Sequence, residues 1–248
     1  MTKAGEARPV VVTGLGAVTP IGHTVDEFWA GMQEGKSGVG PLEGFPLDDL
    51  KILIAAQIKG FDHRARLKHF RRDKIILHAD RYSWFAAAAA DEAVRQSGLE
   101  VPFPNAQRTA CIIGSGAGGF VTLETAYRDL FILNKRATPP LTLLRIIGSS
   151  AASHIGIEFG VGRDYIRHGL VDIAVVGASE SVINYGVMKA WQAMHVLSPE
   201  GCFPFAKKRN GTVLADGAGV LVLESYEHAK ARGATILAEI AGFGMTSD

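Results

Sequence analysis

Short apolar runs alternate with amphipathic segments along the chain. The runs at 9–14, 109–113 and 170–176 are apolar and rich in β-branched residues, which is typical of strands buried on both faces. Further strands are expected at 54–59, 219–223 and 236–240. Strands that alternate with helices predict an α/β fold with a mixed, largely parallel sheet and helices on both faces.

The first expected helix begins near Thr24 and ends at Gly35. Thr24 and Glu27 form a capping box, and the residues that follow place apolar side chains on one face. The other expected helices cover 80–96, 121–133, 146–159 and 185–194. No internal repeat, low-complexity tract or linker interrupts this order, so residues 1–248 are interpreted as one domain.

Composition narrows the class of protein. Hydrophobic residues make up 47% and charged residues 21% of the 248 residues, as in ordinary globular proteins. The net charge of +1 argues against nucleic acid or a membrane surface as a partner. No apolar run approaches the ~20 residues of a membrane span, and the polar N-terminus does not resemble a signal peptide. These features predict a cytoplasmic protein.

Three motifs that suggest ligand or nucleophile chemistry fail on inspection. Residues 114–119 satisfy G-x-G-x-x-G between a strand and a helix, but no acid follows about 20 residues later, so the glycines are interpreted as close-packing positions. Gly35-Lys36-Ser37 lacks the first P-loop glycine and follows a helix. Residues 177–181 lack the last glycine of a serine-hydrolase elbow. No cofactor is therefore predicted.

Neither cysteine shows the marks of an activated nucleophile. Cys111 lies inside an apolar strand and is interpreted as a core residue. Cys202 lies in a loop with no helix N-terminus behind it to lower its pKa, although His195 is near enough in sequence for a Cys–His pair. His154, in a helix of small residues, is interpreted as a buried structural histidine. Two distant cysteines also give no zinc or disulfide pattern, so no metal is expected.

Residues 63–74 form the one strongly basic stretch. Two interpretations remain open for it: a solvated helix face, or a docking surface for an acidic partner. Nucleic acid is the weaker alternative because no second basic stripe accompanies the first.

Several of these segments together resemble β-ketoacyl-acyl-carrier-protein synthases of the type II elongating class, and the nodulation-type ketosynthases most. The resemblance rests on residues 10–22, 28–29, 35–38, 150–160, 186–191, 204–219 and 224–233. It implies a thiolase-like fold, of which this chain is the N-terminal half. The implied chemistry is decarboxylative condensation of acyl and malonyl thioesters on acyl carrier protein, in fatty acid or polyketide synthesis.

The resemblance has a gap where the family carries its catalytic cysteine. After residue 162 the family continues with a strand, the cysteine turn and the start of a helix, whereas this chain continues with residues 163–169, which resemble the end of that helix. The two family histidines belong to a C-terminal half that this sequence does not include. No residue here is therefore expected to be catalytic, and the chain alone is expected to be inactive. A lone half is also expected to expose a large apolar surface.

Two functional readings follow. In the first, the chain is part of an ordinary ketosynthase. In the second, it is a non-catalytic subunit that pairs with a complete ketosynthase, as chain-length factors do. Because such factors usually keep the strand and change only the cysteine, the missing strand favours the first reading.

The expected partners are acyl carrier protein and a ketosynthase subunit, in a homodimer or heterodimer. The residues expected to dock the carrier are Arg64, Lys68, Arg71, Arg72, Lys74 and Arg209. The loop expected to reach a partner's acyl pocket contains Thr138, Pro139, Pro140 and Leu141.

Overall fold

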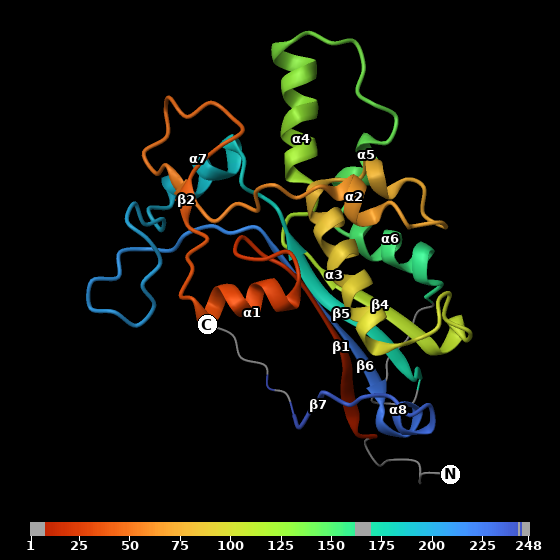
Figure 1. The fold of residues 1–248 in the computed structure, drawn as a ribbon. Helices are drawn as coiled ribbons and strands as arrows, with labels where there is room; N and C mark the ends of the chain where they lie inside the picture. The colour runs from red at the N-terminus through yellow and green to blue at the C-terminus, as the bar shows by residue number, and fades with distance from the viewer. Residues whose placement is uncertain (1–7, 162–169, 243, 245–248) are drawn as a thin grey trace.

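A five-stranded sheet forms the centre of the chain in a computed structural model that describes residues 8–161, 170–242 and 244 (Figure 1). The strand order is β4-β5-β6-β1-β7. In that order the strands are β4 (Thr109–Gly114), β5 (Ile173–Glu180), β6 (Gly217–Ser225), β1 (Val10–Val18) and β7 (Ala238–Glu239). A two-stranded ribbon, β2 (Gly40–Pro41) with β3 (Ile54–Ala55), lies apart from it.

The sheet is mixed, but the prediction that it is largely parallel is wrong. Only β4 and β5 run parallel, whereas β5–β6, β6–β1 and β1–β7 are antiparallel. An apolar run indicates that a strand is buried, but it does not indicate whether the neighbouring strand is parallel or antiparallel.

The helices follow the predicted order with several changes of boundary. They are α1 (Val25–Gln33), α2 (His63–Leu67), α3 (Arg81–Ser97), α4 (Phe120–Tyr127), α5 (Thr142–Ile146), α6 (Ser150–Phe159), α7 (Tyr185–Ala193) and α8 (Tyr226–Ala231). Shorter helical turns are η1 (Ile76–His78), η2 (Ala106–Arg108) and the π-helical η3 (Arg128–Ile132), which extends α4.

Helix α3 is the centre of the main core. Asp80 caps its first turn by accepting from the Tyr82 amide, and Gly98 ends it in the left-handed conformation. Its small side chains let β1 approach closely: a Cβ at Gly16 would lie 2.7 Å from the carbonyl carbon of Ala89. This packing explains why the β1 motif alternates glycines with apolar residues.

Three predicted elements are corrected by local geometry. The helix expected at 146–159 begins only at Ser150 as α6, because α5 ends at Ile146 and the backbone is extended at Ile147. The strand expected at 54–59 contains only β3, since the Ala56 amide bonds instead to the distant Leu214 carbonyl. The strand expected at 170–176 begins at Ile173 and continues to Glu180.

The Thr24 half of the predicted capping box is confirmed, because the Thr24 side chain accepts from the Glu27 amide. The Glu27 carboxylate accepts from the His23 amide at 2.7 Å. The apolar face of α1, however, is not buried in the described structure. Trp29 is 59% exposed and Met32 is 52% exposed. A periodic apolar face identifies a helix without guaranteeing that the same chain covers it.

The two faces of the sheet differ in cover. Residues facing α3, such as Val175, Val220 and Val222, are fully buried. On the opposite face Ile112 is 45% exposed, and Leu221 is only half-buried. Within the described residues, cover by helices on both faces is therefore not seen, and the expected exposed apolar surface is.

Candidate functional site

The basic stretch folds into a short helix and an extended segment over the start of α3 (Figure 1). Asp62 caps α2 by accepting from the Ala65 amide. Five cations are exposed here, and we call them the α2 surface: Arg64, Lys68, Arg71, Arg72 and Lys74. Among the described residues, no ion pair neutralises any of their side chains.

The histidine at the start of α2 adds little to this positive charge. His63 stacks on Trp84 with ring centroids 3.7 Å apart. Burial, and then the neighbouring Arg64, lowers the pKa of His63, so its imidazole is neutral at physiological pH. The charge of the α2 surface therefore comes from lysine and arginine alone.

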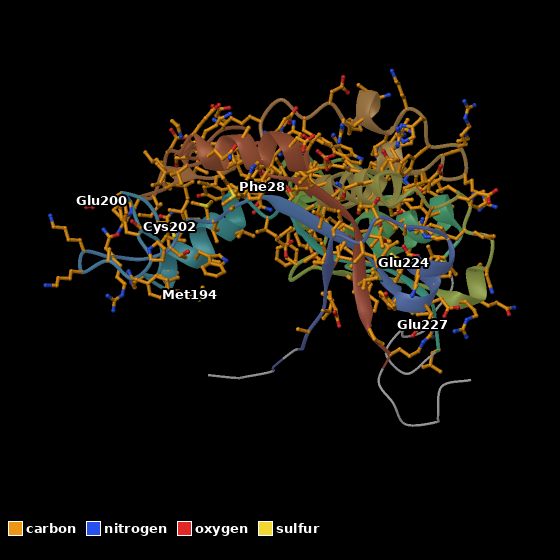
Figure 2. All side chains as sticks on the ribbon, turned by 60° about the horizontal axis from the view of Figure 1, so that its bottom comes forward. Phe28, Met194, Glu200, Cys202, Glu224 and Glu227 are labelled. Atoms are coloured by element: carbon orange, nitrogen blue, oxygen red, sulfur yellow. The ribbon has the colours of Figure 1, made fainter. Side chains whose placement is uncertain are left out.

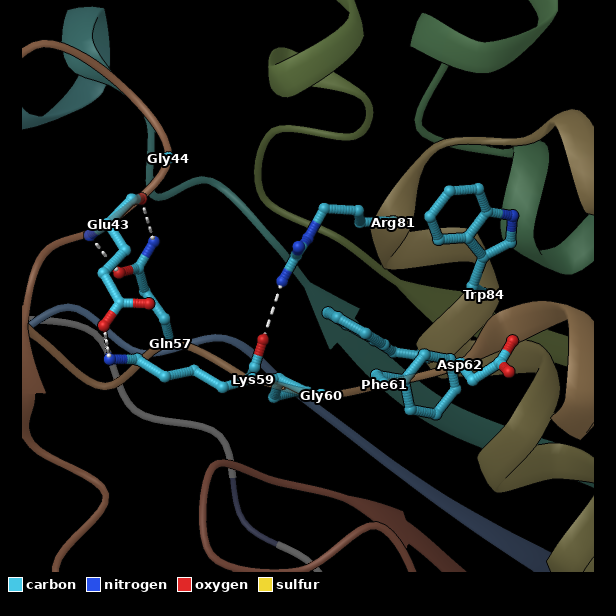
Figure 3. A pocket seen from close by; sticks show the side chains of 11 residues that line it. Glu43, Gly44, Gln57, Lys59, Gly60, Phe61, Asp62, Arg81 and Trp84 are labelled. Carbon is cyan, nitrogen blue, oxygen red and sulfur yellow. Dashed lines mark hydrogen bonds and ion pairs between the residues drawn. The ribbon is translucent and has the colours of Figure 1, made fainter.

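A cavity of about 540 Å³ opens beside the α2 surface (Figure 3). Its wall contains the aromatic rings of Phe61, Trp84 and Phe85, and Lys59 pairs with Glu43 across its mouth at 2.6 Å. Among the described residues that line it, none carries a thiol or an imidazole. The cavity has the shape of a binding pocket without a nucleophile.

Arg81 fixes one side of this cavity, and sequence analysis did not single it out. Its Nη2 donates to the Ile58 carbonyl at 3.0 Å and lies 3.3 Å from Asp216, while its guanidinium lies over the Phe85 ring. Burial raises the pKa of Asp216, and Arg81 opposes that rise. Arg81 and Asp216 are 135 residues apart in sequence, so no local pattern could pair them.

Arg209 does not join the α2 surface. The loop between α7 and β6, to which Arg209 belongs, lies on the side of α7, away from α2 in Figure 1. The Nη1 atom of Arg209 donates to the Ala206 carbonyl at 3.1 Å, so this side chain is hydrogen-bonded within its own loop. The predicted docking residues thus form one cluster of five and a separate cation, Arg209, which lies beside the exposed Lys207 and Lys208.

The predicted acyl-pocket loop forms the base of a projecting arm. Helix α4 with η3 stands away from the body, and the chain returns through residues 133–141 to α5 (Figure 1). The Thr142 hydroxyl donates to the Pro139 carbonyl at 2.7 Å. Pro139 and Thr142 line a cavity of about 250 Å³ together with Asp80, while Thr138 and Leu141 are half-buried and Pro140 is exposed.

The arm carries the most exposed apolar side chains of this region. Phe131 is 75% exposed, Ile132 is 71% exposed and Leu143 is 70% exposed. Leu143 lies in α5, at the base of the arm, whereas Phe131 and Ile132 lie side by side in η3. Isolated exposed apolar residues are ordinary, but neighbouring ones on a projecting arm mark an interaction surface.

The sulfur and imidazole groups do not combine into a catalytic centre among the described residues. Burial raises the pKa of Cys111 to about 12, in agreement with its interpretation as a core residue. Cys202 is exposed in the loop that also carries Glu200, far from the end of the sheet where Glu224 lies (Figure 2). No hydrogen bond joins Cys202 to His195, and His154 is bonded through Nδ1 to Asp73 as a buried structural group.

The glycine-rich loop is occupied by a carboxylate of the chain itself. Glu180 accepts from the amides of Gly116 at 2.6 Å and Ala117 at 3.2 Å. A Cβ at Gly118 would lie 2.7 Å from the Ile146 carbonyl oxygen. The glycines therefore serve close packing, as the sequence predicted, and the loop amides already have an anionic partner.

The described residues contain no group of three or more His, Cys, Asp or Glu side chains that could hold a metal ion. None of their helices has the length and apolarity to cross a membrane.

Comparison with known proteins identifies the sequence family. The family profile "Beta-ketoacyl synthase, N-terminal domain" matches residues 7–162 and 161–229. Nodulation protein E of Rhizobium meliloti is 37% identical over 262 residues, which cover 97% of this chain and 64% of that protein. The 3-oxoacyl-[acyl-carrier-protein] synthase 2 of Vibrio cholerae is 33% identical over 267 residues, with 97% and 64% covered.

A solved structure shares the fold. The ishigamide ketosynthase/chain length factor superposes with a TM-score of 0.87 at 27% identity, over 96% of this chain and 63% of that one. The chain thus spans less than two thirds of the length of its relatives. The thiolase-like fold expected from the resemblance is confirmed.

The comparisons also support the predicted internal gap. The two profile matches meet at residues 161–162, where the resemblance breaks. The alignment with nodulation protein E is longer than this whole chain of 248 residues, so it includes positions that this chain lacks. Residues 163–169, expected to be the end of the interrupted helix, lie outside the described residues.

Proposed function

The chain belongs to the β-ketoacyl synthase family, and from this we propose that it serves acyl-chain condensation by docking acyl carrier protein on the α2 surface. The relative from Vibrio cholerae is named for the synthesis of a 3-oxoacyl group carried on acyl carrier protein. A partner of that class suits an exposed cluster of cations if it presents acidic groups.

The observation that carries this proposal is the concentration of unpaired cations on one surface. Arg64, Lys68, Arg71, Arg72 and Lys74 are all exposed within eleven residues, and the one acid inside that run, Asp73, is buried. Like charges that are not neutralised within the chain repel one another, and an acidic partner would relieve that repulsion. At physiological ionic strength such charges act over about 8 Å, enough to steer an approaching partner.

The test is a double charge reversal, Arg71→Glu with Arg72→Glu, in the 248-residue chain. Binding of a purified bacterial acyl carrier protein is measured by titration calorimetry at several salt concentrations. Rim charges act mainly on association, so we expect about tenfold weaker binding at low salt and a smaller difference at high salt. Unchanged affinity would return the α2 surface to a solvated face.

A matched control has the same change in charge elsewhere. Lys36→Glu with Lys51→Glu reverses two exposed cations outside the α2 surface. We expect this variant to bind carrier protein nearly as well as the original chain. Arg209→Glu tests the separate site beside Lys207 and Lys208, and its effect should add to that of the double reversal because the two sites are far apart.

The chain by itself is proposed to be inactive in condensation. The described residues contain no activated thiol, since Cys111 is buried and Cys202 lacks a base. The same samples are assayed for decarboxylation of malonyl-loaded carrier protein, and we expect none. Measurable decarboxylation by the purified chain would contradict this part of the proposal.

The alternative is a non-catalytic subunit of a cytoplasmic ketosynthase dimer, in which the partner subunit would cover the exposed arm. Phe131, Ile132 and Leu143 would pack against the second subunit, and loop 138–141 would reach its acyl pocket. The similar structure that contains a chain length factor supports this arrangement. Residues 1–248 are treated as one domain in both cases.

A further inference from the structure

Helix α6 holds the α2 surface from beneath through a single carboxylate. Glu158 is 7% exposed, and its Oε1 accepts from the Arg71 amide at 3.0 Å. Its Oε2 accepts from the amides of Arg72 and Asp73, both at 2.9 Å. Three consecutive amides thus converge on one buried side chain that is more than 80 residues away in sequence.

A second side chain of α6 reinforces this hold one helical turn earlier. The Nδ1 atom of His154, which is 8% exposed, bonds to Asp73 Oδ2. The other oxygen of Asp73 accepts from the amides of Ile75 at 2.9 Å and Ile76 at 3.2 Å. His154 and Glu158 lie four residues apart on α6, so they face the same segment.

Within residues 71–76, only backbone amides and the Asp73 carboxylate form these bonds. The amides of residues 71–73 and 75–76 point inward, and the side chains of Arg71, Arg72 and Lys74 are exposed. Without an inward anchor, an extended segment of this length would sample many backbone conformations. A cation cluster can match a partner's acids only when the spacing of its side chains is fixed.

We propose that His154 and Glu158 form a clamp that positions Arg71, Arg72 and Lys74 for an acidic carrier protein. The inference rests on the proposed docking function and adds to it the residues that set the geometry of the surface. Neither clamp residue touches the partner, so both are positioning residues. Their contribution is to keep the docking cations in one arrangement before the partner arrives.

The first variant is Glu158→Gln. In either orientation its carboxamide places an NH₂ group against at least one of the three amides, so at least one of these hydrogen bonds is lost. We expect faster hydrogen exchange at the amides of residues 71–73. We also expect about fivefold weaker binding of a bacterial acyl carrier protein, with a shallower dependence on salt. The control is Glu34→Gln, the same change at an exposed glutamate after α1.

The histidine provides a rescue pair. His154→Asn places an amide nitrogen near the position of Nδ1 and can still donate to Asp73, whereas His154→Leu cannot. We expect carrier binding near the original level for the asparagine variant and about fivefold weaker for the leucine variant. A purely structural role would lower thermal stability in both without separating them in carrier affinity.

Comparison with the charge reversal of Arg71 and Arg72 separates the two proposals. If the reversal weakens carrier binding and Glu158→Gln speeds exchange without changing affinity, the docking function stands and the clamp is overturned. If neither variant changes affinity, docking on this surface is itself wrong, and the inference falls with it. Loss of affinity in both, with rescue by His154→Asn, supports the clamp.

Discussion

The close approach of β1 to α3 makes Gly16 a sharp test of the fold. A Cβ at Gly16 would lie 2.7 Å from the Ala89 carbonyl carbon and 3.0 Å from the Ala93 nitrogen, where ordinary contact begins at 3.4 Å. The Ala89 carbonyl oxygen lies closer still. The obstacle is helix backbone, so Gly16→Ala must move α3 away from the sheet by well over about 0.7 Å. Overpacking of this kind costs about 3 kcal/mol.

The expected shift is large enough for a standard unfolding assay. A urea m-value of about 3 kcal/mol per molar turns that loss into a midpoint about 1 M lower, followed by tryptophan fluorescence. The matched control is Gly219→Ala in the neighbouring strand β6, where a Cβ would meet nothing within 4 Å. Its midpoint should stay the same or rise slightly, because alanine restricts the unfolded chain. Equal losses in the two variants would refute the packing argument.

Two further predictions concern ionisable groups. Burial alone would raise the pKa of Glu224, but hydrogen bonds from Arg232, Thr13 and His228 outweigh it and hold that pKa below its ordinary 4.5. The group therefore stabilises the fold above pH 4.5, and this stability is lost as the pH falls through the lowered pKa. Glu224→Gln should lower stability at pH 7 by about 3 kcal/mol and flatten the acid limb of a stability–pH curve, whereas a parallel, undiminished acid limb would contradict this. Because burial raises the pKa of Cys111 to about 12, the native chain should react with a thiol reagent at Cys202 alone, and two fast equivalents would show that β4 opens readily.

Local signals predicted the local features of this fold well. The Thr24 cap of α1 and the Ala-rich α3 were confirmed within a residue or two, since capping and periodicity depend on neighbours in sequence. The direction of β6 and the break at Ile147 were not predicted, because both are set by tertiary contacts. The resemblance supplied the family and the position of the gap, which periodicity alone could not.

The candidate site shows the same division between local and long-range information. The cations of the α2 surface were visible as a basic run, but the clamp beneath it was not. Its only sequence signal was an acid, Asp73, inside the basic run, together with the i, i+4 spacing of His154 and Glu158. The pair is more than 80 residues away from the basic run in sequence. Its role becomes visible only in the folded chain, where it lies under the run.

The α3 side of the sheet and the arm differ in whether the described residues satisfy their buried or apolar groups. Near α3, two buried carboxylates are bonded within the chain: Glu158 accepts from three amides, and Glu224 binds Arg232, Thr13 and His228. Asp216 is the exception, because its Oδ1 has no hydrogen-bond partner among the described residues. The arm instead exposes Phe131, Ile132 and Leu143 by 70% or more, and nothing in the described residues covers them. Exposed apolar area of this kind is stabilised only by burial against another surface.

Both readings of the function supply that surface, either from the rest of a longer ketosynthase or from a partner subunit. They differ in whether the cover is covalently attached, so dilution should expose the arm in the second case alone.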